Sequence, residues 1–179
     1  EPYQKDALAN ALELRFPALR GESGGGPLYA TAEAIQGKRA ELKSLTEKEI
    51  PANRKAIEEA RAMGDLRENF EYKSARERHE YLNTRVARLH NDLARARPID
   101  FKAIDPSEVR IGTRVHLVAE DGRRRALTVL GPWDSRPEEG ILSYESDLAR
   151  ALLGRSPGET VAMGDTSFRI ERIEPFREA

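Results

Sequence analysis

Three carboxylates lie close together near the middle of the chain, at Asp65, Glu68 and Glu71. Asp65 and Glu68 are three residues apart, so on the first turn of a helix they would share one face. Two exposed carboxylates can hold a hydrated Mg²⁺ through one or two oxygens while a substrate phosphate completes the coordination shell. The spacing therefore suits a metal ligand donated to another molecule's site better than a closed metal cage.

The same residues also fit a purely structural interpretation. Asp65 can act as the N-cap of a helix and Glu68, three residues later, as its capping-box partner. Acidic residues in a first helical turn also complement the helix dipole. On local grounds alone the spacing favours this capping interpretation, because nothing in it requires a metal.

Two amphipathic helices flank the acidic segment. Residues 31–62 are rich in Ala, Glu, Lys, Arg and Leu, although Pro51 should kink or restart this arm. After a connection of only a few residues at Gly64, a second helix carries an unbroken heptad seam. A link this short favours antiparallel neighbours, so residues 28–97 predict a helical hairpin with the carboxylates at its tip. The seam residues are Tyr72, Ala75, His79, Leu82, Val86, Leu89, Leu93 and Ala96.

The remainder, residues 98–179, predicts a small β-rich domain. Ser146 is placed to cap a short helix over residues 147–153, which Gly154 ends. An Asp121-Gly122 turn joins the first two strands. Strands are expected at residues 114–119, 126–130, 140–144, 161–163 and 167–173. The fold class is thus α+β, a coiled-coil hairpin followed by a β-rich domain.

Residues 1–27 are expected to form a short helix over residues 3–16 and a glycine-rich linker, as the probable end of an upstream region. Composition limits the function of the whole chain. Charged residues make up 34% of the 179 residues, yet the net charge is only −1, which gives no overall case for nucleic-acid binding by counterion release. The absence of cysteine excludes disulfides and Cys-based zinc sites. With no apolar run that could cross a membrane, we expect a cytoplasmic protein.

The acidic segment resembles the tip signature of the Gre-type (GreA/GreB) bacterial transcript cleavage factors, a pattern close to G-D-L-x-E-N-x-E-Y. It matches at Gly64, Asp65, Leu66, Glu68, Asn69, Glu71 and Tyr72. Residues 29–31 and 57–61 resemble the first arm of that family, and residues 141–154 resemble its C-terminal domain, which has an FKBP-like fold. Phe70 departs from the pattern, since a small residue is common at that position.

The resemblance implies a factor that enters the secondary channel of bacterial RNA polymerase and promotes cleavage of the RNA 3′ end in a backtracked complex. Asp65 would help to hold a weakly bound Mg²⁺ shared with the polymerase, and Glu68 would orient or activate the attacking water. Asn69, Glu71 and Tyr72 would support the tip. Such a factor completes the site of another enzyme, and we expect it to be monomeric. Candidate RNA contacts are Arg67, Lys73 and Arg76, and candidate polymerase-docking residues are Ser143, Tyr144, Ser146 and Leu148.

Three other functions remain open at this stage. A Gre-like regulator could bind the same channel and inhibit without stimulating cleavage. An FKBP-like domain could be a prolyl isomerase, although such an enzyme needs a deep aromatic-lined pocket. The hairpin could also be a coiled-coil interaction module in which the acids are only caps.

Overall fold

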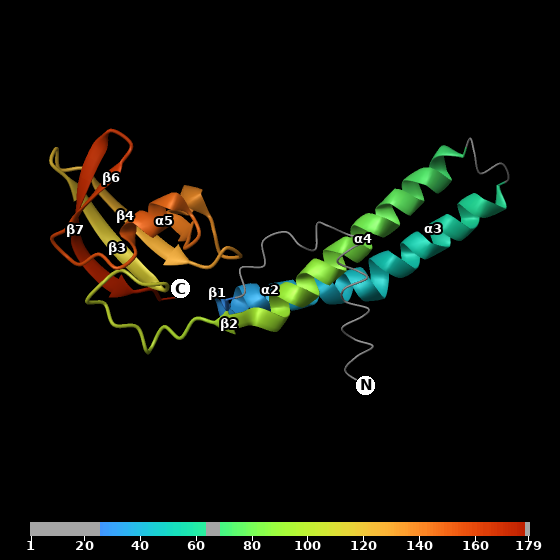
Figure 1. Cartoon of the computed structure of the whole chain (residues 1–179), viewed down its shortest axis with the longest axis horizontal. Coiled ribbons are helices and arrows are strands. Elements are labelled where there is room, and N and C mark those ends of the chain that lie inside the picture. Colours follow the sequence, from blue (N-terminus) through green and yellow to red (C-terminus); the bar gives the residue numbers. More distant parts are fainter. Residues whose placement is uncertain (1–25, 64–68, 178–179) are drawn as a thin grey trace. The chain divides into compact units, whose positions relative to one another are not determined.

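The computed structural model of the chain describes residues 26–63 and 69–177. They form two compact units, which are described separately (Figure 1). One contains Lys38–Arg95, and the other contains Leu28–Gly37 together with the chain from Ala96 onward. The predicted N-terminal helix lies outside the described residues. Within them, no helix is long and apolar enough to span a membrane.

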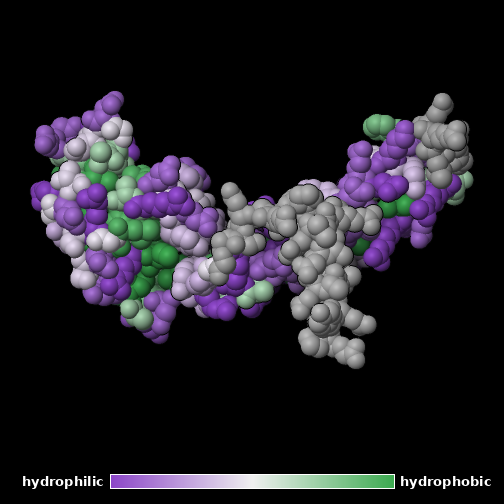
Figure 2. Space-filling model, in the orientation of Figure 1, coloured by the Kyte–Doolittle hydropathy of each residue, from purple (hydrophilic) through white to green (hydrophobic). Residues whose placement is uncertain are grey.

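Apart from residues 32–37, the predicted helical hairpin forms the first unit. Its first arm consists of α2 (Ala32–Ser44), η2 (Leu45–Glu49) and α3 (Ile50–Ala62), and its second arm is α4 (Phe70–Arg95). Figure 1 shows α3 and α4 side by side. The surface of both arms is mainly hydrophilic (Figure 2), as expected for a narrow two-helix element that buries only one seam.

A π-helical turn explains the irregular heptad of the first arm. Leu45 and Ile50 are five residues apart, which in a regular α-helix would place them roughly 140° apart around the axis. In η2 the N–H of Ile50 donates instead to the carbonyl of Leu45, and this wider turn returns both side chains to the seam. α3 restarts with Pro51 in its first turn, where its missing N–H costs little. The predicted restart at Pro51 is confirmed.

The core of the hairpin is small and lies where the heptads meet. Leu82 and Leu89 on α4 are almost fully buried against Leu45 and Ile50, with Leu42 and Val86 packed on this cluster. Nearer the tip the seam is more polar, because the buried Asn53 donates through Nδ2 to the carbonyl of Ala75 at 3.0 Å. The predicted seam is therefore confirmed at its centre, and a polar contact across the arms takes over towards the tip.

The second arm ends earlier than the heptad predicted. α4 stops at Arg95, and Ala96 begins a short strand, β2 (Ala96–Pro98), rather than the last turn of the helix. β2 pairs in parallel with β1 (Leu28–Ala30). This pairing offers the chain backbone hydrogen bonds in place of further helical ones, which sequence periodicity alone does not reveal.

The second unit is built on a curled five-stranded sheet with the order β5-β4-β3-β7-β6. Neighbours are antiparallel except β4 and β5, which run in parallel. α5 (Asp147–Leu152) contributes the buried Ala149 and Leu152 to the core. The remaining elements are β3 (Thr113–Ala119), β4 (Arg124–Leu130), the 3₁₀ turn η3 (Pro137–Glu139), β5 (Ile141–Ser143), β6 (Thr160–Met163) and β7 (Thr166–Pro175). All five predicted strands, the helix and the α+β class are confirmed.

Candidate functional site

The candidate site is the end of the hairpin, where α3 leads into α4. Asp65, Glu68 and Arg67 belong to residues 64–68, which lie outside the described residues. Their predicted roles therefore remain predictions. The structure does describe both flanks of this segment, up to Met63 on one side and from Asn69 on the other.

Asn69 joins the two arms and caps the second. Its Nδ2 donates to the backbone carbonyl of Ala60 at 2.8 Å, and its Oδ1 accepts the N–H of Tyr72 at 3.0 Å. Since α4 begins at Phe70, the second bond is an N-cap bond to the third helical residue. Asn69 is thus the N-cap residue of α4 as the structure describes it. The capping-box interpretation of Asp65 and Glu68 lies outside the described residues.

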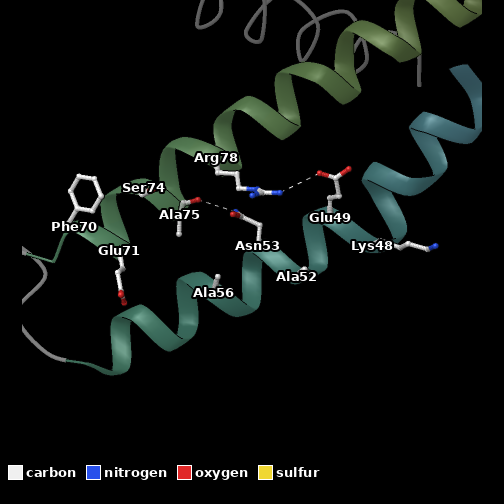
Figure 3. Close-up of a pocket in the computed structure, with 10 residues that line it drawn as sticks. All are labelled: Lys48, Glu49, Ala52, Asn53, Ala56, Phe70, Glu71, Ser74, Ala75 and Arg78. Carbon is white, nitrogen blue, oxygen red and sulfur yellow. Dashed lines mark hydrogen bonds and ion pairs between the residues drawn. The ribbon is translucent and has the colours of Figure 1, made fainter.

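Tyr72 and Glu71 occupy the first turn of α4 with different surroundings. The guanidinium of Arg61 donates to the Tyr72 hydroxyl at 3.5 Å and also lies 5.6 Å from the centre of its ring. This hydrogen bond lowers the pKa of the Tyr72 phenol. Glu71 is exposed, and in Figure 3 its carboxylate extends towards α3. Tyr72 thus ties the last turns of α3 to α4, while Glu71 presents a carboxylate beside the tip.

A shallow groove of about 630 Å³ runs between α3 and α4 behind the tip (Figure 3). Three alanines, Ala52, Ala56 and Ala75, line it with methyl groups. An ion pair between Arg78 and Glu49, at 3.6 Å, spans the two arms at the end away from the tip. The groove is open and weakly polar, and its lining holds equal numbers of basic and acidic side chains. The other lining residues are Lys48, Asn53, Phe70, Glu71 and Ser74.

The two described candidate RNA contacts differ in their surroundings. Arg76 lies 3.8 Å from Glu80, one turn further along α4. Lys73 is exposed, and its ammonium has no ion pair within the described part of the chain. Of this pair, Lys73 is the cation more available to an external phosphate.

Further from the tip, an ion-paired cluster ties the arms together. Glu41 accepts hydrogen bonds from Arg85 Nε at 2.8 Å and from Lys38 Nζ at 2.9 Å. Partial burial raises the pKa of Glu41, but the hydrogen bonds from Lys38 and Arg85 more than offset this effect, so its pKa lies below the ordinary value. Arg85 comes from α4 and Glu41 from α2, so the ionised carboxylate contributes to the pairing of the arms.

The metal assignment rests on the tip alone. Among residues 26–63 and 69–177, no group of three or more His, Asp or Glu side chains is arranged to hold a metal ion. Asp65, the one predicted ligand, lies outside those ranges. Its oxygen donors, with those of Glu68, are of the kind that Mg²⁺ prefers.

The predicted docking residues of the C-terminal unit mostly organise the turn into α5. The hydroxyl of Ser146 accepts the N–H of Ala149 at 3.3 Å as the predicted N-cap, and it donates to the carbonyl of Ser143 at 2.8 Å. Tyr144 and Leu148 are partly buried and pack on the core of the sheet. These contacts explain the sequence at all four positions without a partner, and docking there remains a prediction.

A buried contact that the sequence did not predict lies in the same unit. Asp134 accepts the N–H of Thr31 at 3.0 Å and its hydroxyl at 2.6 Å, and both residues are at least 94% buried. The Thr31 hydroxyl in turn accepts the N–H of Ala34, so it caps α2. Asp134 ends a turn that begins at Gly131. The backbone of Tyr29 and Ala30 lies so close to Gly131 that no Cβ would fit there. Because Thr31 and Asp134 are 103 residues apart, no local pattern in the sequence indicates this contact.

Comparison with known proteins covers both units. Residues 28–97 match the family model for the N-terminal part of the GreA/GreB transcription elongation factors, and residues 104–175 match the model for their C-terminal part. The chain belongs to the GreA/GreB family. The resemblance first noted at the acidic segment is confirmed on both sides of it.

Individual relatives agree with this assignment. The chain is 43% identical to transcription elongation factor GreA of Treponema pallidum (strain Nichols) over 139 residues, which is 77% of this chain and 86% of that protein. It is 38% identical to GreA of Chlamydia trachomatis over 169 residues, or 93% of this chain. That match spans only 24% of the Chlamydia protein, and a match to GreA of Borreliella burgdorferi, at 39% identity, spans 16%. Relative to these two Gre proteins, the chain therefore covers about a quarter of the length or less.

Among solved structures, a GreA factor homologue from Thermus thermophilus, Gfh1, aligns with 83% of this chain and 99% of its own at 19% identity, with a TM-score of 0.40. A GreA/GreB factor from Nitrosomonas europaea aligns with 82% of this chain at 17% identity and a TM-score of 0.38. At these scores the structural likeness adds no support beyond the family match.

Proposed function

We propose that this chain is a transcript cleavage factor, which enters the secondary channel of bacterial RNA polymerase and stimulates cleavage of backtracked RNA. The observation that carries the proposal is the acidic segment itself, present in a chain of the Gre family with both Asp65 and Glu68 retained. Because Asn69 caps α4, the helix start does not need either of these acids as its cap.

In this function the chain completes an active site that belongs to the polymerase. Asp65 would contribute a carboxylate oxygen to the Mg²⁺ shared with that site, where two metal ions can stabilise the attacking and leaving oxygens of an in-line displacement. Glu68 would accept a hydrogen bond from the attacking water and orient it towards the scissile phosphate. The chain itself is then not an enzyme, and its partners are the polymerase and the 3′ end of the nascent RNA.

The contacts near the tip support a role in positioning. Asn69 bonds to both arms, and Arg61 holds Tyr72 one turn away. Carboxylates donated to a foreign site must arrive in a defined position, because small displacements of catalytic groups reduce rates strongly. These hydrogen bonds hold the last turn of α3 against the start of α4, and the acidic segment connects these two points in the sequence.

The structure disfavours the prolyl isomerase alternative. Phe168 is buried in the core, and the rings of Phe101 and Phe176 pack edge to face at 5.8 Å. Tyr144 packs on the same core. Within the described residues these aromatic side chains pack against one another or against the core, whereas such an enzyme needs aromatic side chains that line a deep pocket.

The test is RNA cleavage in purified, backtracked bacterial elongation complexes. Wild type should shorten the transcript in a Mg²⁺-dependent reaction, and Asp65→Asn combined with Glu68→Gln should abolish the stimulation while polymerase binding is kept. The matched control is Glu58→Gln combined with Glu77→Gln, which removes the same two charges from exposed positions along the arms and should cleave like wild type. Binding without cleavage by wild type would instead identify an inhibitory Gre-like regulator, and absence of binding would refute the polymerase hypothesis for this chain.

A further inference from the structure

The first residue of α4, Phe70, presents an aromatic ring to solvent at the functional end of the hairpin. Its side chain is 80% exposed, and Figure 3 shows the ring projecting away from α3. A single exposed apolar side chain is ordinary on a protein surface. The position of this one is not ordinary, because Phe70 follows the predicted catalytic residues Glu68 and Asp65 by two and five residues.

The covalent chain limits how far the backbone of Phe70 can lie from that of Glu68. Consecutive Cα atoms are about 3.8 Å apart, so the Cα of Phe70 lies within roughly 7.6 Å of the Cα of Glu68. If Glu68 acts on a phosphodiester of the RNA, the ring lies within reach of the nucleotides next to that bond.

A cation accompanies the ring on the same face of α4. Lys73 follows Phe70 by three residues, a spacing that places side chains next to one another on a helix. Its ammonium has no ion pair within the described part of the chain, whereas Arg76 and Arg78 each lie within 4 Å of an acid. An exposed aromatic ring beside a cation that pairs with no acid among the described residues matches a nucleotide, which offers a flat base and an anionic phosphate.

We propose that Phe70 is a stacking platform for an unpaired base of the extruded RNA 3′ segment, and that Lys73 contacts a neighbouring phosphate. Aromatic side chains bind single-stranded nucleic acid in this way with little sequence preference, because every base has a flat face. The ring projects away from α3 and is exposed, which leaves room for a base against it. This inference rests on the proposed function, since it requires the hairpin end to meet RNA.

Stacking has a practical consequence for cleavage. It would hold the extruded segment against the hairpin while the carboxylates act, so its loss should slow cleavage without abolishing it. Phe70 does not belong to the buried cluster around Leu82 and Leu89 that forms the core of the hairpin. Removing its ring also leaves the Asn69 cap of α4 in place. Variants at Phe70 should therefore fold normally, with unchanged helical circular dichroism.

The experiment compares single-turnover cleavage by wild type, Phe70→Ala, Phe70→Leu and Phe70→Trp in backtracked complexes. A matched control is Tyr81→Ala, because Tyr81 is 67% exposed on the same helix but lies about 16 Å further along it. We expect Phe70→Ala and Phe70→Leu to be about tenfold slower, Phe70→Trp to be at least as fast as wild type, and Tyr81→Ala to be unchanged. Lys73→Gln should lower the rate and make it less dependent on salt.

A second set of complexes carries an abasic site at the extruded nucleotide. There the difference between wild type and Phe70→Ala should disappear, since no base remains to stack. Wild-type rates for Phe70→Ala on normal RNA would overturn the inference. Rescue by Phe70→Leu, or a defect that persists on abasic RNA, would also overturn it and would assign the ring to an apolar contact with the polymerase. The proposed function fails separately, if wild type does not cleave or if Asp65→Asn with Glu68→Gln cleaves normally.

Discussion

Replacing Gly131 by alanine tests whether the turn at residues 131–134 must lie directly against β1. A Cβ at this position would fall inside contact distance of the carbonyl oxygen of Tyr29, and 2.9 Å from Cα of Ala30. Both of these are backbone atoms, which cannot rotate away as the end of a flexible side chain can. The glycine is required by this close approach, so the turn and β1 must separate in the variant.

The size of the effect follows from what the separation breaks. Asp134 accepts two hydrogen bonds from Thr31, at 3.0 and 2.6 Å, in a site that water barely reaches. A hydrogen bond to a charged group contributes roughly 1.5–3 kcal/mol, and a buried donor left without a partner costs a similar amount. We therefore expect Gly131→Ala to lower the free energy of unfolding of this unit by about 3 kcal/mol.

The assay uses the single tryptophan of the chain, Trp133, which lies within the turn. Its fluorescence during urea unfolding reports the C-terminal unit, while far-ultraviolet circular dichroism follows the helical hairpin. With a slope of roughly 2 kcal/mol per M, the expected loss lowers the fluorescence midpoint by about 1.5 M urea. The matched control is Gly37→Ala, because a Cβ at this helical glycine meets nothing within 4 Å. That substitution should leave the midpoint unchanged or raise it by up to about 0.5 M.

One result would refute the reasoning. If Gly131→Ala unfolds at the same urea concentration as wild type, the turn can move away from β1 without cost. The bonds between Thr31 and Asp134 would then contribute little, and the first turn of α2 would not depend on the C-terminal unit for its cap.

Two further predictions concern the hairpin. Asn69→Ala removes the cap of α4 and the hydrogen bond to Ala60, so the thermal midpoint of the helical signal should fall by an amount equivalent to about 1–2 kcal/mol. Asn69→Asp keeps the cap and should lose less stability. Equal stability of wild type and Asn69→Ala would contradict the assigned hydrogen bonds. Glu41→Gln should destabilise the hairpin by about 0.5–1 kcal/mol at pH 7, because Arg85 then loses its charged partner. The pKa of Glu41 is depressed in the folded state, so this contribution is present above the unfolded pKa and is lost as the pH falls through the folded one. Wild type and Glu41→Gln should thus converge once the pH falls below the folded pKa of Glu41, and a difference in stability that does not shrink as the solution is acidified would argue against an ionic contribution.

Local patterns predicted most of the fold because the deciding interactions are close in sequence. The heptad seam on α4 and the turn at Asp121-Gly122 each depend on neighbouring residues, and both are present. The N-cap at Ser146 needs only the three residues that follow it. Where a pattern depends on a few adjacent residues, periodicity and turn chemistry are sufficient.

Interactions distant in sequence account for what the patterns missed. The end of α4 at Arg95 depends on β2 pairing with β1, more than 60 residues earlier. The cap of α2 depends in part on Asp134, which is 103 residues away. In the sequence, nothing distinguishes Asn53 on α3 from an ordinary exposed polar residue. Its burial is explained only by its hydrogen-bond partner, the carbonyl of Ala75 on the other arm. A single sequence carries no signal for which distant backbone group such side chains meet.

The acidic segment shows how one neighbouring residue can decide between two interpretations. From the sequence alone, Asp65 and Glu68 fitted a capping box as well as they fitted a metal site, and the structural interpretation was the simpler one. Asn69 changes this balance, because it provides the N-cap bond to Tyr72 and also closes the hairpin through Ala60. If selection kept the two acids only to start α4, the helix would not need Asn69 in that position as well. The observed cap means that the start of α4 at Phe70 does not by itself explain the two acids. Under the proposed function, amide substitutions at Asp65 and Glu68 should reduce cleavage far more than they reduce the stability of the hairpin.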